Sequence, residues 1–245
     1  MKMKKVILVL GIASLVLSAS AKIEEAIDAA LTDGIVMGTP FADGMVLQRG
    51  MKVPVWGKVS PGGNSLPPKV TVSFAGQKKS AMADPATGVW KVELDPMEAS
   101  KESRTMTVVK ETGFWFVDLF SSPTDTVEIK DVLVGEVWFC SGQSNTELPL
   151  VGNNPHFSDR LGRLAAQMTV KPNIRYCYAS NYKWSTEPKT KADYKVAWKP
   201  FMPENLGTKP SFSAMGVYFA LELYSALEIP IGIVGSYWGG TNIDA

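Results

Sequence analysis

The 245-residue chain is predicted to be an α/β protein, with an antiparallel β-sandwich first and the opening half of a parallel α/β domain after it. Three observations lead to this prediction. Short, often alternating apolar segments separated by turn residues fill residues 35–130, as in antiparallel sandwiches. From residue 131 the apolar runs become continuous, which is typical of buried parallel strands. A segment with helical spacing then lies between such runs, as in a βα arrangement.

The first 21 residues have the layout of a secretory signal peptide. Three lysines precede an apolar run over residues 6–17, and the small residues Ala19-Ser20-Ala21 follow it. The run is shorter than the roughly 20 residues of a transmembrane helix, although a retained anchor remains a second interpretation. We therefore expect residues 1–21 to be removed, which leaves a periplasmic or extracellular protein with no membrane attachment. Residues 22–34 are expected to form a leader with weak helical spacing.

The sandwich domain is predicted over residues 35–130, because its strand-like segments are short and separated by Gly, Pro, Asn and Asp clusters. The interpretation of residues 114–120 stays open between a strand and an aromatic insertion. The clearest expected strands cover residues 53–56, 70–74, 89–94 and 106–109.

The second domain is predicted over residues 131–245 and begins with an apolar strand at 132–140. A helix capped by Ser211 or Ser213 is expected to run to about Leu227 and to be buried, because apolar residues surround it on most sides. Residues 183–210 form a long stretch punctuated by prolines, which is typical of a functional or disordered loop. The other expected elements are a helix at 161–168 and strands at 174–179 and 231–236.

The tetrapeptide Gly142-Gln143-Ser144-Asn145 directly follows the strand predicted at 132–140. Ligands of open α/β sheets bind beyond the carboxyl ends of the strands, where a nucleophilic hydroxyl can be displayed. The motif differs from the Gly-x-Ser-x-Gly elbow of α/β-hydrolases because Asn145 stands directly after the serine. Ser144 is therefore a candidate nucleophile, and a polar turn after a core strand is the alternative interpretation.

A second glycine-rich loop, Trp238-Gly239-Gly240-Thr241-Asn242, follows the strand predicted at 231–236. Glycines let the backbone approach a ligand closely and present its N–H groups. If Thr241 or Asn242 caps a helix, these N–H groups suit an oxyanion. A plain β-to-α turn with glycines for steric reasons is the alternative.

Several motifs, in order, resemble the sialate O-acetylesterase family, a branch of the SGNH-type hydrolases, over roughly residues 40–245. The segments that carry this resemblance are 45–49, 53–57, 134–138, 141–145, 212–214, 230–233 and 238–241.

This resemblance implies a division of labour among the residues of the two loops. Ser144 would attack an acetyl ester, and its own N–H and that of Gly239 or Gly240 would hold the oxyanion. Gly142, Gln143 and Asn145 would shape the loop, Asn145 by side-chain hydrogen bonds. The family also uses a further oxyanion donor from a Gln/Asn-containing loop and an Asp-x-x-His motif, neither of which is seen in these residues. Thr146 stands where family members commonly carry Met, which is expected to alter packing beside the nucleophile.

His156 is the only histidine of the sequence. It could act as the base that a serine nucleophile needs, but its Asn- and Pro-rich surroundings favour a solvated loop. Removal of the base of a serine triad costs on the order of 10⁶ in kcat. We therefore expect a C-terminally incomplete catalytic domain that is nearly inactive by itself.

The expected substrate is O-acetylated sialic acid or a related acetylated glycan. Acetylxylan esterase activity is a close alternative, and a non-catalytic glycan-binding or scaffold protein is a rival from another class. Trp184 and Trp198, in the proline-rich stretch, are candidate substrate contacts, whereas Trp56 and Trp90 lie on strand patterns and are expected in the core.

Composition excludes some partners. The formal charge is +1, from 25 basic and 24 acidic residues, and gives no electrostatic case for nucleic acid. The sequence shows no metal-ligand spacing, and no cofactor is expected. Whether Cys140 and Cys177 pair stays open, with two buried thiols favoured over a disulfide.

Overall fold

A computed structural model describes residues 34–60, 67–111, 125–150, 172–178, 197–206 and 212–240. These residues form mostly β-sheet, of mixed direction, with few helices. The strands are β1 (Ile35–Met37), β2 (Val46–Gln48), β3 (Val53–Val59), β4 (Lys69–Phe74), β5 (Gln77–Met82), β6 (Val89–Leu94), β7 (Ser100–Glu111), β8 (Asp125–Gly142), β9 (Ile174–Tyr178), β10 (Trp198–Pro200) and β11 (Ile231–Tyr237). The helices are α2 (Ser144–Glu147), α4 (Pro203–Leu206) and α5 (Ala214–Leu227).

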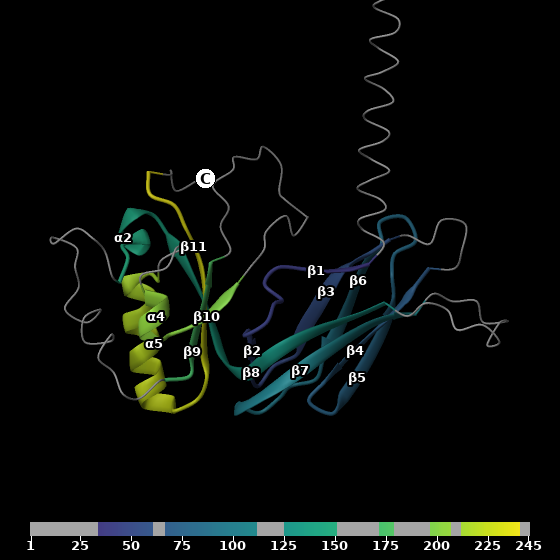
Figure 1. Ribbon diagram of the computed structural model, residues 1–245, viewed down its shortest axis with the longest axis horizontal. Coiled ribbons are helices and arrows are strands. Elements are labelled where there is room, and N and C mark those ends of the chain that lie inside the picture. Colours follow the sequence, from purple (N-terminus) through teal and green to yellow (C-terminus); the bar gives the residue numbers. More distant parts are fainter. Residues whose placement is uncertain are drawn as a thin grey trace, which may run out of the picture.

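The described chain forms two lobes that lie side by side (Figure 1). In the N-terminal lobe, the sheet β1-β3-β6 faces strands β4, β5, β7 and the first half of β8. In the other lobe, β9, β11 and the second half of β8 run parallel, with β10 antiparallel at the edge. A single path, β10-β9-β11-β8-β7-β4-β5, joins the strands of both lobes, and β2 pairs with β8.

Strand β8 belongs to both lobes. Its first half pairs antiparallel with β7, and its second half pairs parallel with β11, from Glu136 opposite Ile231 to Gly142 opposite Tyr237. The β7–β8 register shifts near Asp131, which has a φ of 57°. A left-handed residue at a register shift bends a strand as a β-bulge does. The domain boundary predicted between residues 130 and 131 therefore lies inside β8, at this bend.

The N-terminal lobe owes its core to strand alternation. Inward positions of β3 and β6 alternate with exposed ones, so that Val55, Trp90 and Leu94 are buried. The expectation that Trp90 lies in the core is confirmed, but the same expectation for Trp56 is wrong. Trp56 points outward because its neighbour Val55 points inward, and it packs edge-on against Phe41 at a centroid distance of 4.7 Å.

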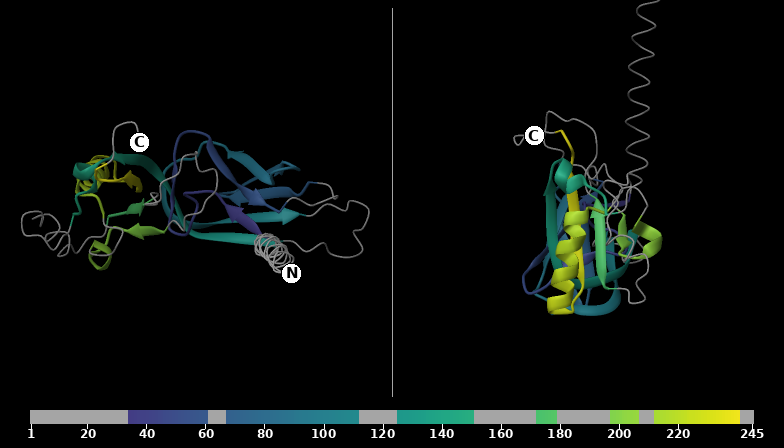
Figure 2. Two further views of the ribbon diagram at one scale, coloured as in Figure 1. Left: turned by 90° about the horizontal axis from the view of Figure 1, so that it is seen from above. Right: turned by 90° about the vertical axis from the view of Figure 1, so that its left-hand side faces the viewer.

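Helix α5 lies along the parallel strands (Figure 2) and begins where the sequence predicted. The Ser213 hydroxyl caps it by accepting the Gly216 N–H at 3.2 Å. The prediction that the helix is buried is wrong. Only one side packs on the sheet, through Gly216, Val217 and Ala220, while Tyr218 and Phe219 are exposed among the described residues.

The opposite face of the parallel strands packs against the N-terminal lobe. Cys177 of β9 and Trp198 of β10 share one apolar core with Val134 and Leu47. The two lobes are therefore joined by a continuous core as well as by a shared strand.

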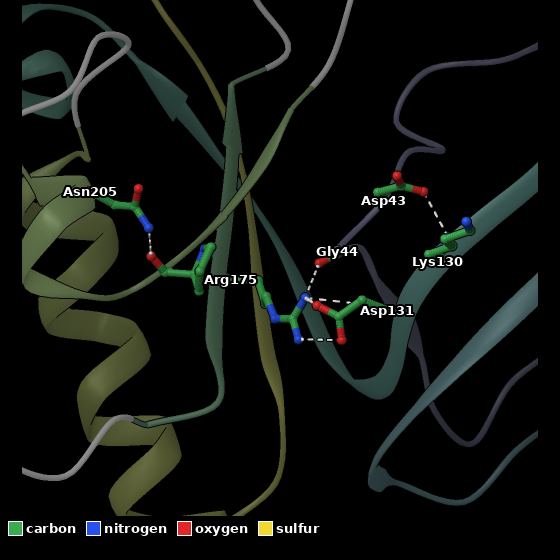
Figure 3. Close-up of polar contacts among 7 residues, drawn as sticks. Asp43, Gly44, Lys130, Asp131, Arg175 and Asn205 are labelled. Carbon is green, nitrogen blue, oxygen red and sulfur yellow. Dashed lines mark hydrogen bonds and ion pairs between the residues drawn. The ribbon is translucent and has the colours of Figure 1, made fainter.

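An ion pair between the buried Arg175 and the exposed Asp131 also joins the lobes. The Arg175 guanidinium of β9 donates to both carboxylate oxygens of Asp131, at 2.6 and 3.0 Å, and to the Gly44 carbonyl at 2.9 Å (Figure 3). These hydrogen bonds lower the pKa of Asp131 against the opposing effect of burial. Gly44 has a φ of 78°, and a Cβ there would lie 3.1 Å from the guanidinium, so the close approach suits glycine.

The signal and leader, the segment 114–120 and the helix expected at 161–168 lie outside the described residues. Among the helices that the structure describes, none is long and apolar enough to cross a membrane.

Candidate functional site

Ser144 begins helix α2 directly after β8, with Gln143 at the N-cap position. Gly142, Gln143, Ser144 and Asn145 are all exposed. The turn between strand and helix is tight, because a Cβ on Gly142 would clash with the side chain of the buried Thr146. The candidate nucleophile is thus displayed at the carboxyl end of a strand, on a turn that suits glycine.

The second glycine-rich loop lies beside this serine. Strand β11 is the parallel neighbour of β8, and the Trp238 N–H just after it donates to the Gly142 carbonyl at 3.2 Å. A Cβ added to Gly239 would lie 3.4 Å from Ser144 Cβ. The structure therefore brings together the two motifs, although nearly a hundred residues separate them in the sequence. Gly240 is exposed, with a φ of 81°.

Glu147 is a site residue that the sequence analysis missed. Its Oε2 accepts the Gly239 N–H at 2.6 Å. It lies three residues after Ser144, and residues three apart share one face of a helix, which is the signal that could have pointed to it. In this structure, an N–H expected to serve an oxyanion therefore has a carboxylate oxygen as its acceptor.

Three tyrosines contact one another at the end of strand β11, where the Gly239 loop begins. The hydroxyls of Tyr176 and Tyr237 form a hydrogen bond, and the Tyr178 hydroxyl donates to the Tyr237 carbonyl at 2.7 Å. Burial raises the pKa of the Tyr176 and Tyr237 hydroxyls well above the usual value, so both remain neutral. These contacts fix the end of β11, from which the Gly239 loop departs.

The two cysteines are free thiols, as favoured, but only Cys177 is buried and Cys140 is partly exposed. Strand β11 separates Cys140 on β8 from Cys177 on β9, so about 10 Å lies between the outer strands, beyond the reach of a disulfide. They also point to opposite faces, because Cys177 pairs with Val234 and Cys140 with the next residue, Gly235. Burial raises the pKa of both thiols.

Trp198 does not fit the role of a substrate contact. It is 7% exposed, packs in the core between the lobes and donates its indole N–H to the Pro40 carbonyl at 2.9 Å. Its position on the short edge strand β10 turns the ring inward. Trp184, His156, Thr241 and Asn242 lie outside the described residues. Within the described ranges, no three His, Cys, Asp or Glu side chains gather as metal ligands.

Comparison with known proteins identifies similar chains. No protein-family model matches. The human protein named sialate O-acetylesterase is 30% identical over 200 residues, which cover 78% of this chain and 34% of the human protein. Its mouse counterpart, with the same name, is 31% identical over 197 residues, covering 78% of this chain and 33% of the mouse protein.

A solved bacterial immunoglobulin-like domain from the M. primoryensis ice-binding adhesin aligns with 42% of this chain and 98% of its own length, at 15% identity and a weak TM-score of 0.30.

The chain spans about one third of the length of the curated relatives that it matches. The similarity to these relatives, over most of the chain, confirms the resemblance predicted from the motifs. The chain is a sialate O-acetylesterase-like protein.

Proposed function

We propose that this chain carries the nucleophile of a serine esterase that removes O-acetyl groups from sialic acid or a related glycan. One observation supports the proposal above all: the Gly239 loop lies against Ser144, with a Cβ at Gly239 only 3.4 Å from Ser144 Cβ. An exposed serine beside a glycine-rich loop is the arrangement that acyl transfer requires, because nucleophile and oxyanion donors must meet at one carbonyl group.

In the proposed reaction, Ser144 Oγ bonds to the acetyl carbonyl carbon as a base accepts its proton. Backbone N–H groups of Ser144 and of the Gly239-Gly240 loop stabilise the negative oxygen of the tetrahedral intermediate. The C–O bond to the glycan then breaks, and the glycan oxygen leaves with the proton. Water attacks the acetyl-serine, releases acetate and restores Ser144.

The proposed substrate rests on the similar proteins, which are named sialate O-acetylesterases. The described residues contain no feature that separates an acetylated sialic acid from an acetylated xylan, so acetylxylan esterase activity remains the alternative within the same reaction. We also propose that the protein is secreted, since residues 1–21 have the pattern of a signal peptide.

The proposed chemistry needs a general base. His156 is the only histidine in the 245 residues and lies outside the described ranges. We propose that the base is not His156, because its Asn- and Pro-rich surroundings favour a solvated loop. These residues alone should then turn over acetyl esters very slowly, since loss of the triad base costs on the order of 10⁶ in kcat.

Chemical rescue tests the proposal. Hydrolysis of an aryl acetate and of an O-acetylated sialic acid is measured for the purified chain and for its Ser144→Ala and His156→Ala variants, with and without added imidazole as an external base. The Ser144→Ala variant measures the background reaction of imidazole itself. We expect imidazole to raise the rate of the chain and of His156→Ala equally above this background.

Two outcomes would contradict parts of the proposal. A folded chain with no rate above that of Ser144→Ala, at any imidazole concentration, would favour the non-catalytic glycan-binding interpretation. A fast rate without imidazole that is lost in His156→Ala would make His156 the base.

A further inference from the structure

Glu147 contacts the candidate site in a way that the esterase mechanism does not require. Its carboxylate oxygen lies 2.6 Å from the Gly239 nitrogen, a short distance typical of a charge-assisted hydrogen bond. Such bonds are roughly twice as strong as neutral ones. The carboxylate is half-buried, so solvent competes for it less than for a surface acid.

The helix places this carboxylate on the same side as the nucleophile. Helix α2 is a single turn from Ser144 to Glu147, closed by the hydrogen bond from the Leu148 N–H to the Ser144 carbonyl at 3.0 Å. Residues at the two ends of one turn lie on one face. The serine and the carboxylate therefore meet the Gly239 loop together.

Gly239 lies close to both ends of helix α2. A Cβ at this position would lie 2.8 Å from Glu147 Oε2 and 3.4 Å from Ser144 Cβ. The loop thus contacts the carboxylate and the nucleophile from the same side of α2. It is joined to the nucleophile turn by two backbone donors, the Gly239 N–H to Glu147 and the Trp238 N–H to Gly142, and the bond to Glu147 is the shorter.

We propose that Glu147 is a positioning residue, whose carboxylate holds the Gly239 peptide beside Ser144. This inference rests on the proposed esterase function. It also assigns the Gly239 N–H to Glu147 rather than to the oxyanion, so that the loop's contribution to the oxyanion comes from another N–H. Loss of the carboxylate should displace the loop and misplace that donor, and an error of about 1 Å in such a site can cost about 10²-fold in rate.

The contact itself is tested without any activity. In glycine-labelled protein, the Gly239 amide signal is assigned by its loss in Gly239→Ala and compared by NMR between the wild type and the Glu147 variants. We expect the amide proton to move to a weakly bonded position in Glu147→Ala, which has no acceptor. In Glu147→Gln, which still offers a neutral oxygen acceptor, the signal should move less. Glu204→Ala, on the short helix α4, is the control and should leave the Gly239 signal unchanged.

The role in catalysis is tested by the Ser144-dependent, imidazole-supported hydrolysis of an aryl acetate. We expect Glu147→Ala to lower kcat about 10- to 100-fold with little change in KM, and Glu147→Gln to keep most of the rate because it keeps an acceptor. Glu204→Ala should behave like the unmodified chain.

Three results would overturn the inference. A Gly239 amide signal that is the same in the wild type and in Glu147→Ala would remove the contact. A rate that is unchanged or higher in Glu147→Ala, or equally low in Glu147→Ala and Glu147→Gln, would remove the role of its acceptor in positioning. A Gly239 amide that responds to Glu147→Ala in a protein without any Ser144-dependent rate would instead overturn the esterase proposal, and with it the catalytic role of the contact.

Discussion

Two adjoining segments of β8, residues 132–135 and 136–142, have different surroundings. Residues 132–135 are all buried, between β7 on one edge, β2 on the other and the core shared by the lobes. Residues 136–142 include no buried residue, and Trp138 and Phe139 are 44% and 67% exposed. In the described structure, this second half pairs along one edge only, with β11.

This comparison shows where the candidate site lies relative to the packed part of the molecule. Residues 132–135 have strand neighbours on both edges, so this segment serves as a fixed base. The second half carries Ser144 out of the core to the exposed turn. A strand anchored at one end and open at the other can present a nucleophile without burying it.

The largest effects are expected from core truncation in either lobe. Trp90→Ala in the N-terminal lobe and Phe212→Ala under α5 each remove a fully buried ring and should destabilise the protein by about 3–5 kcal/mol. Because β8 and one continuous core join the lobes, both variants should shift a single unfolding transition, measured in urea by fluorescence and circular dichroism. Two separate transitions, of which each variant shifts only one, would show that the lobes fold independently.

A smaller effect is expected at the junction. Arg175→Met should cost about 1–3 kcal/mol, the value of hydrogen bonds to a charged group, because Asp131 and the Gly44 carbonyl lose their donor. Lys69→Met, which removes an exposed ion pair with Glu111, is the control and should cost less than about 1 kcal/mol.

The stability lost in Arg175→Met should depend on pH. The pKa of Asp131 is lowered in the folded protein by Arg175, so its contribution to stability is present above the unfolded value of about 3.9 and is lost as the pH falls through the folded pKa. The stability gap between the wild type and Arg175→Met should therefore narrow below about pH 4. A gap that is constant from pH 7 to pH 3 would contradict this account of the pair.

The smallest effect on stability is expected at exposed positions of the second lobe, on residues 136–142 of β8 and on helix α5. Phe139→Ser and Met215→Ser alter exposed apolar side chains and should change the free energy of unfolding by less than about 1 kcal/mol. Exposed apolar surface favours association, so both variants should sediment with less concentration-dependent self-association than the wild type. Met82→Ser, at an exposed position of the N-terminal lobe, is the control. An equal decrease in self-association in all three variants would show that the exposed apolar side chains of the two lobes behave alike.

Periodicity in the sequence predicted much of the fold. The alternating segments became β3, β4, β6 and β7, the apolar runs became β8, β9 and β11, and Ser213 caps the predicted helix. The error over the burial of α5 has a physical cause. Apolar residues all round a helix indicate what it can bury, but not whether both sides have a neighbour.

The geometry of the candidate site could be predicted only in part, because its contacts join distant positions. The motifs named Ser144 and Gly239 as candidates, and parallel pairing of their strands brings these two residues together. The bond from Gly239 to Glu147 spans 92 positions, and that from Trp198 to the Pro40 carbonyl spans 158. No local pattern encodes such pairs, so the contact of Glu147 with Gly239 and the burial of Trp198 emerge only in the folded chain.

The central claim is that Ser144 is the nucleophile, and trapping the acyl-enzyme tests it most directly. The chain and its Ser144→Ala variant are incubated with an aryl acetate and imidazole, quenched in acid, and analysed by mass spectrometry of the intact protein and its peptides. We predict one acetyl group on the peptide that contains Ser144, absent from the variant. Acetylation that is the same in both proteins, or a folded chain with no acetyl group on that peptide, would contradict the claim.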